Sequence, residues 1–263
     1  MGELPSYGEL WDKEPFDFYD RVRLTEPVYW DEGLQAWLVT SYRDCAVVLR
    51  REDSFERADR HLPGAMEARG NTRYLNTALG ETHDVLHKLL MNLIDHRATE
   101  RYRIAVIRPI VVNLLRAITR GHRQELSSAI ADILPTRVGL TLLGVDTDDE
   151  DLVERVRILR LQMAHWDETM GSKPEVTRAA VEADRDLRDF FMPLIRTRCK
   201  SPGRDLISQL WEAGPRHLAD WSEEDTYAGC LGYMAGGETS HLLCNFTISA
   251  ALRPAHSASN SQL

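Results

Sequence analysis

The chain has 263 residues, with 32 basic and 41 acidic side chains and a formal net charge of −9 at pH 7. Because the basic residues are scattered among acids, nothing marks a phosphate-tracking surface, and we expect no nucleic acid partner. The start of the chain lacks the basic flank and apolar core of a signal sequence, and the most apolar segments are too short to span a bilayer. We therefore expect a cytoplasmic protein without a membrane partner.

The first part of the chain contains one region that favours β-structure. Residues 27–42 carry aromatic and β-branched side chains on both sides of Glu32 and Gly33, a pattern that predicts a hairpin of two strands. A helical pattern follows in "SYRDCAVVLRR". Residues 61–80 hold glycine, proline and asparagine without a period, so we interpret them as a long loop with at most one short helix.

After this loop, apolar residues recur at helical spacing, and the predicted fold class is therefore mainly α. The predicted helices cover residues 81–97, 99–120, 123–144, 149–167, 174–199, 204–213 and 223–253. The segments between them, such as "GVDTDDED" and "AGPRHLADWSEED", are rich in residues that cap helices or form turns. A chain of this length buries a sizeable core, and we expect one large domain.

The last predicted helix contains an unusual stripe of small residues. Ser222 followed by Asp225 is a capping-box pattern, and the helix can run to Pro254, which indicates a central, buried helix. One narrow stripe of it holds Gly229, Gly232, Gly236, Thr239 and Ser240. Since an interior glycine destabilises a helix by about 1 kcal/mol relative to alanine, the stripe indicates either close packing of another helix or a flat ligand against the backbone.

Glu238 and Thr239 follow two glycines in the same helix. A threonine hydroxyl can bond a backbone carbonyl in place of a helical hydrogen bond, so this weakened turn could hold water and relay protons. The alternative is a solvated acid beside a threonine that bonds its own backbone. The two residues alone leave both interpretations open.

The stretch "AGGETS", residues 235–240, matches the A/G-G-x-D/E-T-T/S motif in the oxygen-binding helix of the cytochrome P-450 family. Three earlier stretches resemble the same family in the expected order: "AWLVTSYRDCAVVLRREDSFERA", "ILPTRVGLTLLGVDTDDED" and "GRDLISQLWEAG". The similarity is continuous from about residue 5 to residue 254. The chain thus resembles the heme-thiolate monooxygenases of the soluble bacterial kind.

This resemblance implies the cytochrome P-450 fold, with a small β region near the N-terminus. It implies a monooxygenase that inserts one oxygen atom from O₂ into a small organic substrate, with heme as cofactor and a ferredoxin or other electron-transfer protein as partner. Glu238 and Thr239 would be the catalytic residues that deliver protons to oxygen. The substrate would lie near residues 61–80 and 160–176. The implied cofactor-binding residues are His83, His87, Ala235, Gly236 and Thr239.

One departure from the family concerns the heme propionates. The family usually places a histidine and an arginine four residues apart; His83 fits the first position, and His87 stands at the second. Read without the family, His83 and His87 with Asp84 between them imitate the H-E-x-x-H zinc site. Because Asp84 is shorter than the required glutamate and no third ligand is marked by position, we expect histidines that face solvent or a propionate.

A larger departure concerns the thiolate ligand. The family takes it from a late F-x-x-G-x-x-x-C-x-G loop, and none of Cys45, Cys199, Cys230 and Cys244 stands in that pattern, so no metal ligand is predicted. Without a C-x-x-C pair, these cysteines are typical of reduced thiols, and the cations around Cys199 would only raise its reactivity. Four E-x-x-R strings precede the last helix and are interpreted as ordinary i, i+3 helix pairs.

The similarity stops near Pro254. Residues 255–263 are small and polar, which predicts a disordered tail after an N-terminal part of a cytochrome P-450 domain, residues 1–254, truncated after the oxygen-binding helix. Such a chain predicts marginal stability and weak or absent thiolate-type heme binding. Two other hypotheses stay open: a non-catalytic fragment that binds a small molecule or heme through His83 or His87, and an inactive remnant.

Overall fold

The computed structural model describes most of the chain between residues 16 and 252. The described residues are 16–32, 36–51, 53–55, 73–75, 78–118, 125–168 and 173–252. Within the helices, the description leaves out the side chains of residues 168, 236–242, 245, 246 and 249–252. The chain divides into two compact units, Met1–Gly70 with His165–Val181 and Asn71–Ala164 with Glu182–Leu263.

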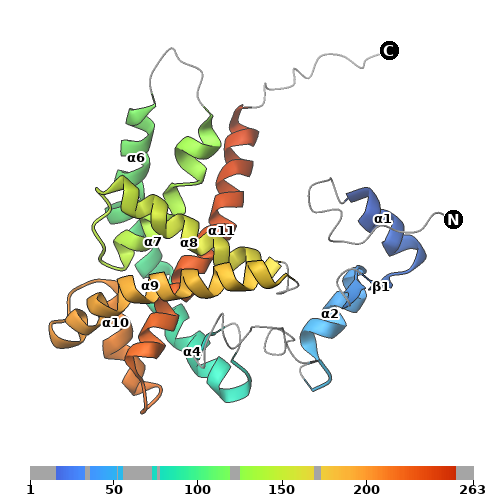
Figure 1. Ribbon diagram of the computed structural model, residues 1–263, viewed down its shortest axis with the longest axis horizontal. Coiled ribbons are helices and arrows are strands. Elements are labelled where there is room, and N and C mark those ends of the chain that lie inside the picture. Colours follow the sequence, from blue (N-terminus) through green and yellow to red (C-terminus); the bar gives the residue numbers. More distant parts are fainter. Residues whose placement is uncertain are drawn as a thin grey trace. The chain divides into compact units, whose positions relative to one another are not determined.

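The first unit contains the predicted hairpin. Its first elements are α1 (Phe16–Thr25), β1 (Val28–Asp31), β2 (Ala36–Val39) and α2 (Tyr42–Arg50), shown in Figure 1. The two strands are antiparallel, with Trp30 opposite Trp37, so the predicted hairpin is confirmed. Phe18 and Val22 of α1 are buried in a small apolar cluster that includes Tyr29 of β1. Apolar side chains therefore hold α1 to the hairpin.

The same unit includes the end of α8 (Glu150–Glu168) and the start of α9 (Pro174–Lys200). Trp166 Nε1 donates a hydrogen bond to Thr177 Oγ1 at 3.1 Å, and both side chains are buried. Val176 packs against Trp166 in a second small apolar cluster. The buried indole N–H is thus satisfied where the two helices meet.

The described part of the second unit is helical. Its elements are α4 (Gly80–Leu93), α5 (His96–Tyr102), η3 (Arg103–Ile107), α6 (Arg108–Ala117), η4 (Ser127–Ala131), α7 (Leu134–Leu142), α10 (Leu206–Ala213), η5 (Gly214–Arg216) and α11 (Glu223–Leu252), with most of α8 and α9. The first part of α11 is buried, and the helix as a whole packs against α7, α10 and η4. Figure 1 shows α11 among these helices. The prediction of a central, buried last helix is confirmed for this part.

One large apolar core holds the second unit together. Its fully buried side chains come from α4, α7, α8, α9, α10 and α11 and from Leu143, which directly follows α7. Those in the helices include Leu89, Leu140, Val153, Leu187, Phe191, Ile195, Leu206, Ile207, Leu210, Tyr227 and Leu231. Each helix contributes the apolar face that its sequence period predicts. The mainly α prediction is confirmed.

Two predicted helix boundaries are wrong. The predicted helix 81–97 is divided, since α4 ends at Leu93 and the carboxylate of Asp95 accepts a hydrogen bond at 2.7 Å from the backbone N–H of Ala98, which caps α5. The predicted helix 123–144 is likewise divided between η4 and α7. Apolar periodicity continued through both breaks, and the signals that mark them are the Asp95 cap at the start of α5 and Pro135 in the first turn of α7.

At the predicted break after α7, the chain at Gly144 lies in close contact with Asp205. Gly144 has a φ of +78°, and Val145 N donates to Leu140 O at 3.0 Å, which closes the end of α7. A Cβ at Gly144 would lie 2.7 Å from the Cβ of Asp205. Asp205 in turn accepts a hydrogen bond from Ser208 N at 2.9 Å and caps α10. Glycine is therefore required here for both its conformation and its size.

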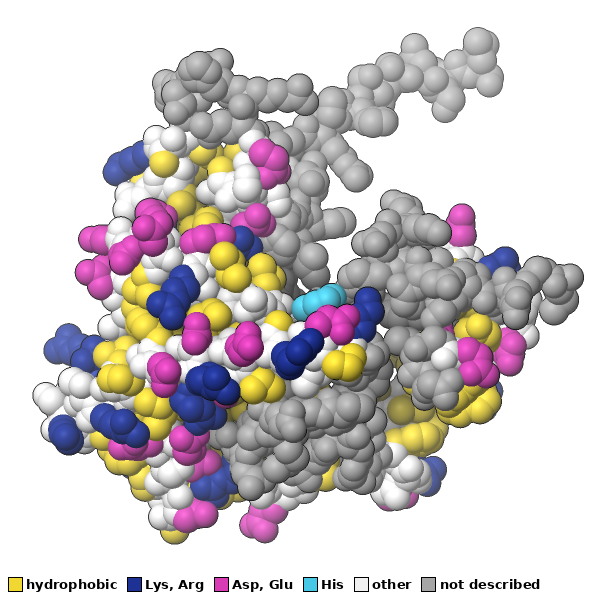
Figure 2. Space-filling view, viewed as in Figure 1, with side chains coloured by type: hydrophobic (Ala, Val, Ile, Leu, Met, Phe, Trp, Pro, Cys, Tyr) yellow, Lys and Arg dark blue, Asp and Glu magenta, His cyan; other side chains and the backbone are white. Residues whose placement is uncertain are grey.

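Several sequence-based expectations fall outside the described residues, among them most of the loop at 61–80 and the whole of the tail at 255–263. In the part of the chain that is described, no helix is both long and apolar enough to cross a membrane. On the face of the second unit shown in Figure 2, basic and acidic side chains are interspersed. This distribution agrees with the scattered charges of the sequence.

Candidate functional site

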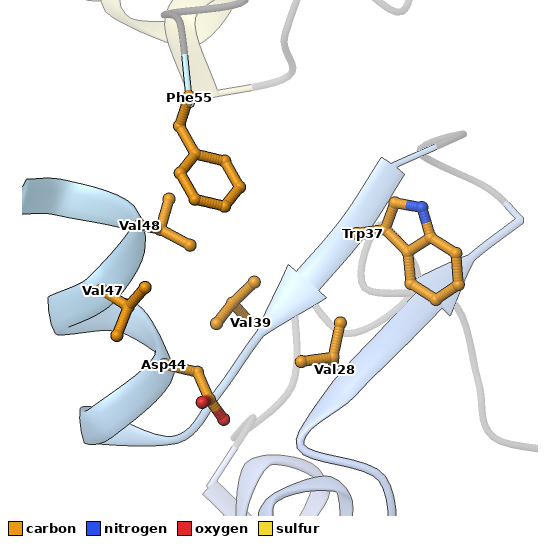
Figure 3. A pocket seen from close by; sticks show the side chains of 7 residues that line it. All are labelled: Val28, Trp37, Val39, Asp44, Val47, Val48 and Phe55. Atoms are coloured by element: carbon orange, nitrogen blue, oxygen red, sulfur yellow. The ribbon is translucent and has the colours of Figure 1, made fainter. Parts of the chain in front are cut away.

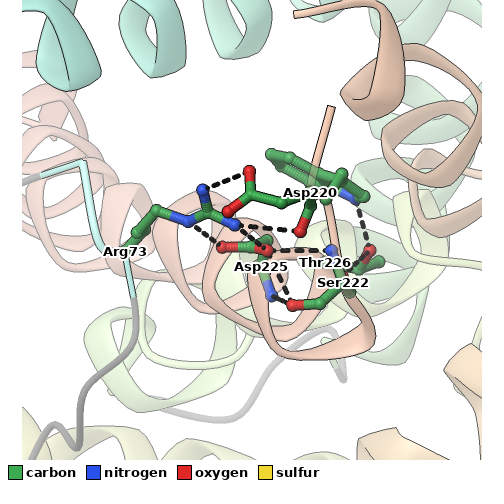
Figure 4. Close-up of polar contacts among 6 residues, drawn as sticks. Arg73, Asp220, Ser222, Asp225 and Thr226 are labelled. Carbon is green, nitrogen blue, oxygen red and sulfur yellow. Dashed lines mark hydrogen bonds and ion pairs between the residues drawn. The ribbon is translucent and has the colours of Figure 1, made fainter. Parts of the chain in front are cut away.

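The N-terminus of α11 is fixed by the predicted capping box. Ser222 Oγ donates to an Asp225 carboxylate oxygen at 2.6 Å, and Asp225 N donates back to Ser222 Oγ at 3.3 Å (Figure 4). The backbone N–H of Ser222 also donates to Asp225, at 2.8 Å. Trp221 Nε1 donates to Thr226 Oγ1 at 2.9 Å in the first turn. These bonds satisfy groups that a helix start would otherwise leave unpaired.

Arg73 adds an ion pair to this helix start. Its Nε and one terminal nitrogen both donate to Asp225 at 2.7 Å, while the other terminal nitrogen donates to Asp220 at 2.8 Å (Figure 4). The Asp225 side chain is only 4% exposed. The hydrogen bonds with Asp225 and Asp220 raise the pKa of Arg73 above its ordinary value. Arg73 therefore neutralises a buried carboxylate at the base of α11.

The next turns of α11 are buried against α9. Tyr227 Oη donates to an Asp184 carboxylate oxygen at 2.8 Å, and the guanidinium of Arg188 lies 4.5 Å from the centre of the Tyr227 ring. Burial, followed by the nearby Asp184 charge, raises the pKa of Tyr227 above its ordinary value. These contacts hold one face of α11 in a single orientation.

The stripe of small residues on α11 divides into two parts. A Cβ at Gly229 would lie 2.9 Å from a methyl carbon of Leu210 in α10, so glycine at this position allows close helix packing. A Cβ at Gly232 would meet none of the described atoms within 4 Å, and this residue is exposed. The packing explanation thus holds at Gly229, and Gly232 opens onto free space. The side chains of Thr239 and Ser240, farther along the stripe, lie outside the described residues.

The two predicted histidines lie on α4. The rings of His83 and His87 are nearly parallel, with an interplanar angle of 21° and their centroids 5.8 Å apart. His83 is partly exposed and His87 is exposed, whereas Leu86 and Leu90 of the same helix are buried. The pair therefore lies at the border between the core and the solvent, with both rings accessible.

One hydrogen bond joins the helix of the histidines to the helix of the motif. Tyr233 Oη in α11 donates to the backbone carbonyl of Leu90 in α4 at 2.9 Å. Leu90 follows His87 by three residues, and Ala235 follows Tyr233 by two. At a rise of about 1.5 Å per residue, His87 on α4 and Ala235 on α11 each lie within about one helical turn of this contact along their own helix. The structure thus brings α4 and α11 together beside the predicted site.

Comparison with known proteins shows which proteins this chain resembles. No protein-family model matches the chain. Mycinamicin IV hydroxylase/epoxidase of Micromonospora griseorubida is 30% identical over 258 residues, which is 94% of this chain and 58% of that protein. The biotin biosynthesis cytochrome P450 of Bacillus subtilis (strain 168) is 25% identical over 251 residues, 92% of this chain and 61% of that protein. This chain is a relative of the bacterial cytochromes P450.

Solved structures agree on the fold. P450BioI, in complex with an acyl carrier protein ligated to hexadec-9Z-enoic acid, has a TM-score of 0.77 at 22% identity, over 95% of this chain and 64% of that chain. Epothilone B-bound cytochrome P450epoK has a TM-score of 0.77 at 21% identity, over 98% of this chain and 65% of that chain. The predicted cytochrome P450 fold is confirmed. The chain spans 48% to 61% of the length of the first curated relatives that it matches.

Within this cytochrome P450 fold, some of the predicted site residues are described with their side chains and others with their backbone alone. His83, His87 and Ala235 are described with their side chains, and Ala235 is partly buried. Gly236, Glu238 and Thr239 lie on α11, but the description extends only to their backbone. Their proposed roles at the cofactor and in proton delivery stay predictions.

In this P450 relative, the prediction that Cys199 is a more reactive thiol is wrong. Burial and the charge of Glu223 raise the pKa of Cys199, although the neighbouring cations in the sequence predicted a more reactive thiol. Arg198 is instead engaged with Asp205, at 2.6 Å. Burial also raises the pKa of Cys230, whose side chain is fully buried. Neither thiol lies in an environment that favours a thiolate.

Two E-x-x-R strings are confirmed as helix pairs. Arg103 bonds Glu100 through two nitrogens, and Arg157 bonds Glu154 through two nitrogens at 2.7 Å each. Both pairs lie three residues apart on one helical face.

A separate apolar pocket of about 440 Å³ lies in the first unit, between the hairpin and α2 (Figure 3). Its lining consists of Val28, Trp37, Val39, Asp44, Val47, Val48 and Phe55. Among the described lining residues, only Asp44 has a charged group, and its carboxylate already accepts a hydrogen bond from Ser41 Oγ at 2.6 Å. The described lining contains neither the histidines of α4 nor the residues of the P450 motif.

Sequence reasoning missed Arg73 and Tyr233. Their hydrogen-bond partners are 152 and 143 residues away along the chain. No local pattern connects such distant positions, because the pairing exists only once the helices have packed.

Proposed function

We propose that this chain carries the oxygen-side residues of a heme-dependent monooxygenase, which inserts one oxygen atom from O₂ into a small organic substrate. The observation that carries the proposal is the hydrogen bond between Tyr233 and Leu90. It joins α11 just before the "AGGETS" motif to α4 just after the two predicted histidines. The cytochrome P450 fold of the relatives supports the same assignment.

The described residues suit a flat cofactor with carboxylate groups. Gly232 faces free space on a helix that is otherwise buried in this region, and Ala235 adds only a methyl group one turn later. His83 and His87 would donate ring N–H groups to the heme carboxylates. When bound, heme supplies the activation of dioxygen at its iron.

Glu238 and Thr239 would handle the protons of the reaction. The Thr239 hydroxyl can accept a proton from one neighbour and donate its own to the next, and the Glu238 carboxylate can take up the proton that replaces it. The two glycines before them weaken the helix and leave room for water between its backbone groups. The rigid first turns of α11 would keep this pair in position.

The electrons would come from a ferredoxin or other electron-transfer protein, and the substrate would be a small organic molecule. One solved relative is bound to an acyl carrier protein that holds a fatty acid, so a carrier-bound substrate belongs to the same proposal. Residues 1–254 would form the cytochrome P450 part, and residues 255–263 a polar tail.

A second function is a non-catalytic fragment that binds heme or a small molecule through His83 or His87. Two of the four cysteines favour it, since burial raises the pKa of Cys199 and Cys230 and so disfavours a thiolate at either residue. The two accessible imidazoles on α4 are the alternative iron ligands.

A heme titration separates these functions. Purified chain is titrated with iron protoporphyrin IX, reduced, and exposed to carbon monoxide. A spectrum of the thiolate-ligated type supports the monooxygenase, and one of the imidazole type that disappears in His83→Ala or His87→Ala supports the binding fragment. Absence of saturable heme binding contradicts the binding fragment.

The proton-handling pair is tested by variants in the heme-loaded protein, supplied with electrons by a ferredoxin and its reductase. Thr239→Val and Glu238→Gln are expected to lower product formation by about a hundredfold, the size of a lost proton-transfer group, and to release more of the consumed O₂ as peroxide. Thr247→Val is the matched control, because Thr247 is an exposed threonine of the same helix that bonds Leu243 O. An equal effect of the control variant would contradict the assigned roles.

A further inference from the structure

We propose that, in the chain without heme, His83 and His87 form a chelating site for a borderline transition-metal ion such as Cu²⁺, Ni²⁺ or Zn²⁺. The two residues are one turn apart on α4, and both rings are accessible. Imidazole nitrogen is the side-chain ligand that these ions share as a preference. The inference does not depend on the proposed monooxygenase function.

The distance between the two imidazole rings is suited to the binding of one shared ion. Their centroids are 5.8 Å apart. An ion held at about 2.1 Å from a nitrogen lies about 3 Å from the centre of that ring, so two rings that share one ion are separated by about 5–6 Å. The side chains need only rotate about χ2, a soft torsion for histidine, to turn one nitrogen of each ring toward the same ion.

The carboxylate of Asp84 supplies an independent observation. One of its oxygens lies 3.3 Å from Nδ1 of His83. A ligand histidine commonly donates its second ring N–H to a carboxylate, which fixes the tautomer and leaves the other nitrogen free to bind metal. With Nδ1 of His83 donating to Asp84, the Nε2 lone pair is available to the ion.

The remaining ligands of the ion are water. Among the residues that the structure describes, no group of three or more histidine, cysteine, aspartate or glutamate side chains gathers around a common point. The described residues thus supply two imidazole ligands and no third protein ligand. Two imidazoles and solvent make an open site that prefers Cu²⁺, Ni²⁺ and Zn²⁺ over Mg²⁺, because Mg²⁺ takes oxygen ligands.

Calorimetric titration of the full chain, without a polyhistidine tag and without heme, tests the proposal. NiCl₂ is expected to bind with one ion per chain, and MgCl₂ to give no binding. His83→Ala and His87→Ala should each weaken Ni²⁺ binding more than about tenfold, and Asp84→Asn by about tenfold, the loss typical of a residue that orients a metal ligand. Since all three side chains are partly or fully exposed, the variants should fold normally, which circular dichroism checks.

His96→Ala is the matched control, because His96 is an exposed histidine on the neighbouring helix α5. It should leave Ni²⁺ binding unchanged. Thermal unfolding gives a second readout: at Ni²⁺ a hundredfold above its dissociation constant, the midpoint should rise by about 5 °C in the wild type and in His96→Ala, and much less in His87→Ala. Equal Ni²⁺ affinity in wild type and His87→Ala, or equal binding of Mg²⁺, would overturn the proposal.

Discussion

Replacement of Arg73 by methionine should expose how strongly the base of α11 depends on one ion pair. Arg73→Met keeps most of the aliphatic side chain and removes both 2.7 Å hydrogen bonds to Asp225. The Asp225 carboxylate is 4% exposed, so its charge would lose the cationic partner that the described residues give it while it stays out of water. Breaking a buried ion pair in this way costs about 3–5 kcal/mol.

Two features of the structure reduce this figure. Arg73 itself is 28% exposed, so water reaches part of the pair, and Ser222 continues to donate two hydrogen bonds to Asp225. We therefore expect a loss of about 2–3 kcal/mol in the free energy of unfolding. For a chain of this size, that loss lowers the thermal midpoint by about 5–10 °C.

Urea unfolding followed by circular dichroism measures the effect, with the slope of the transition as a check on two-state behaviour. Asp220→Asn is the control, because Asp220 is 78% exposed and its bond to Arg73 is screened by solvent. It should leave the transition nearly unchanged. The double variant Arg73→Met/Asp225→Asn should recover part of the loss, since it removes the unpaired charge. If Arg73→Met and Asp220→Asn behave alike, the argument from burial is refuted.

Two further variants test local conformation, and two test titration at high pH. Gly144→Ala should destabilise the chain by about 2–3 kcal/mol, because its φ is +78° and the new Cβ would meet Asp205 at 2.7 Å. Gly80→Ala, at φ +54° with none of the described atoms within 4 Å of the new Cβ, should cost only about 1 kcal/mol, as urea unfolding will show. Burial raises the pKa of Cys230 and Tyr227 above their ordinary values of 9.0 and 10.0, so above those values the unfolded chain binds fewer protons and stability falls as pH rises. Each group contributes up to about 1.4 kcal/mol per pH unit, and Cys230→Ala or Tyr227→Phe should make the decline of the thermal midpoint between pH 9 and 11 less steep; an unchanged slope would contradict burial of that group.

Local sequence signals were reliable where neighbouring residues decide the structure. The hairpin at 28–39 followed from side-chain type and a turn, and the capping box of Ser222 and Asp225 from two residues three apart. The helix at 174–199 was predicted from its period and observed as α9, Pro174–Lys200. These features depend on interactions between residues close in sequence, so they can be predicted from the sequence alone.

The same local signals failed where another interaction, local or between distant residues, outweighed them. The period of apolar residues continued through Asp95, yet the side chain of Asp95 caps a new helix. Around Cys199, the sequence shows only cations, whereas the fold brings Glu223 near and turns Arg198 toward Asp205. Charge next to a residue in sequence is therefore a poor guide to its environment in space.

For the candidate site, the sequence by itself determined the residue types: the "AGGETS" motif, two histidines four residues apart, and a stripe of small residues on one helix face. Only the tertiary structure decided what surrounds them. It packed Gly229 against Leu210, left Gly232 open, and joined α11 to α4 through Tyr233. The reason is that helical periodicity fixes which side chains share a face, but the partner of that face is chosen by packing among helices far apart in the chain.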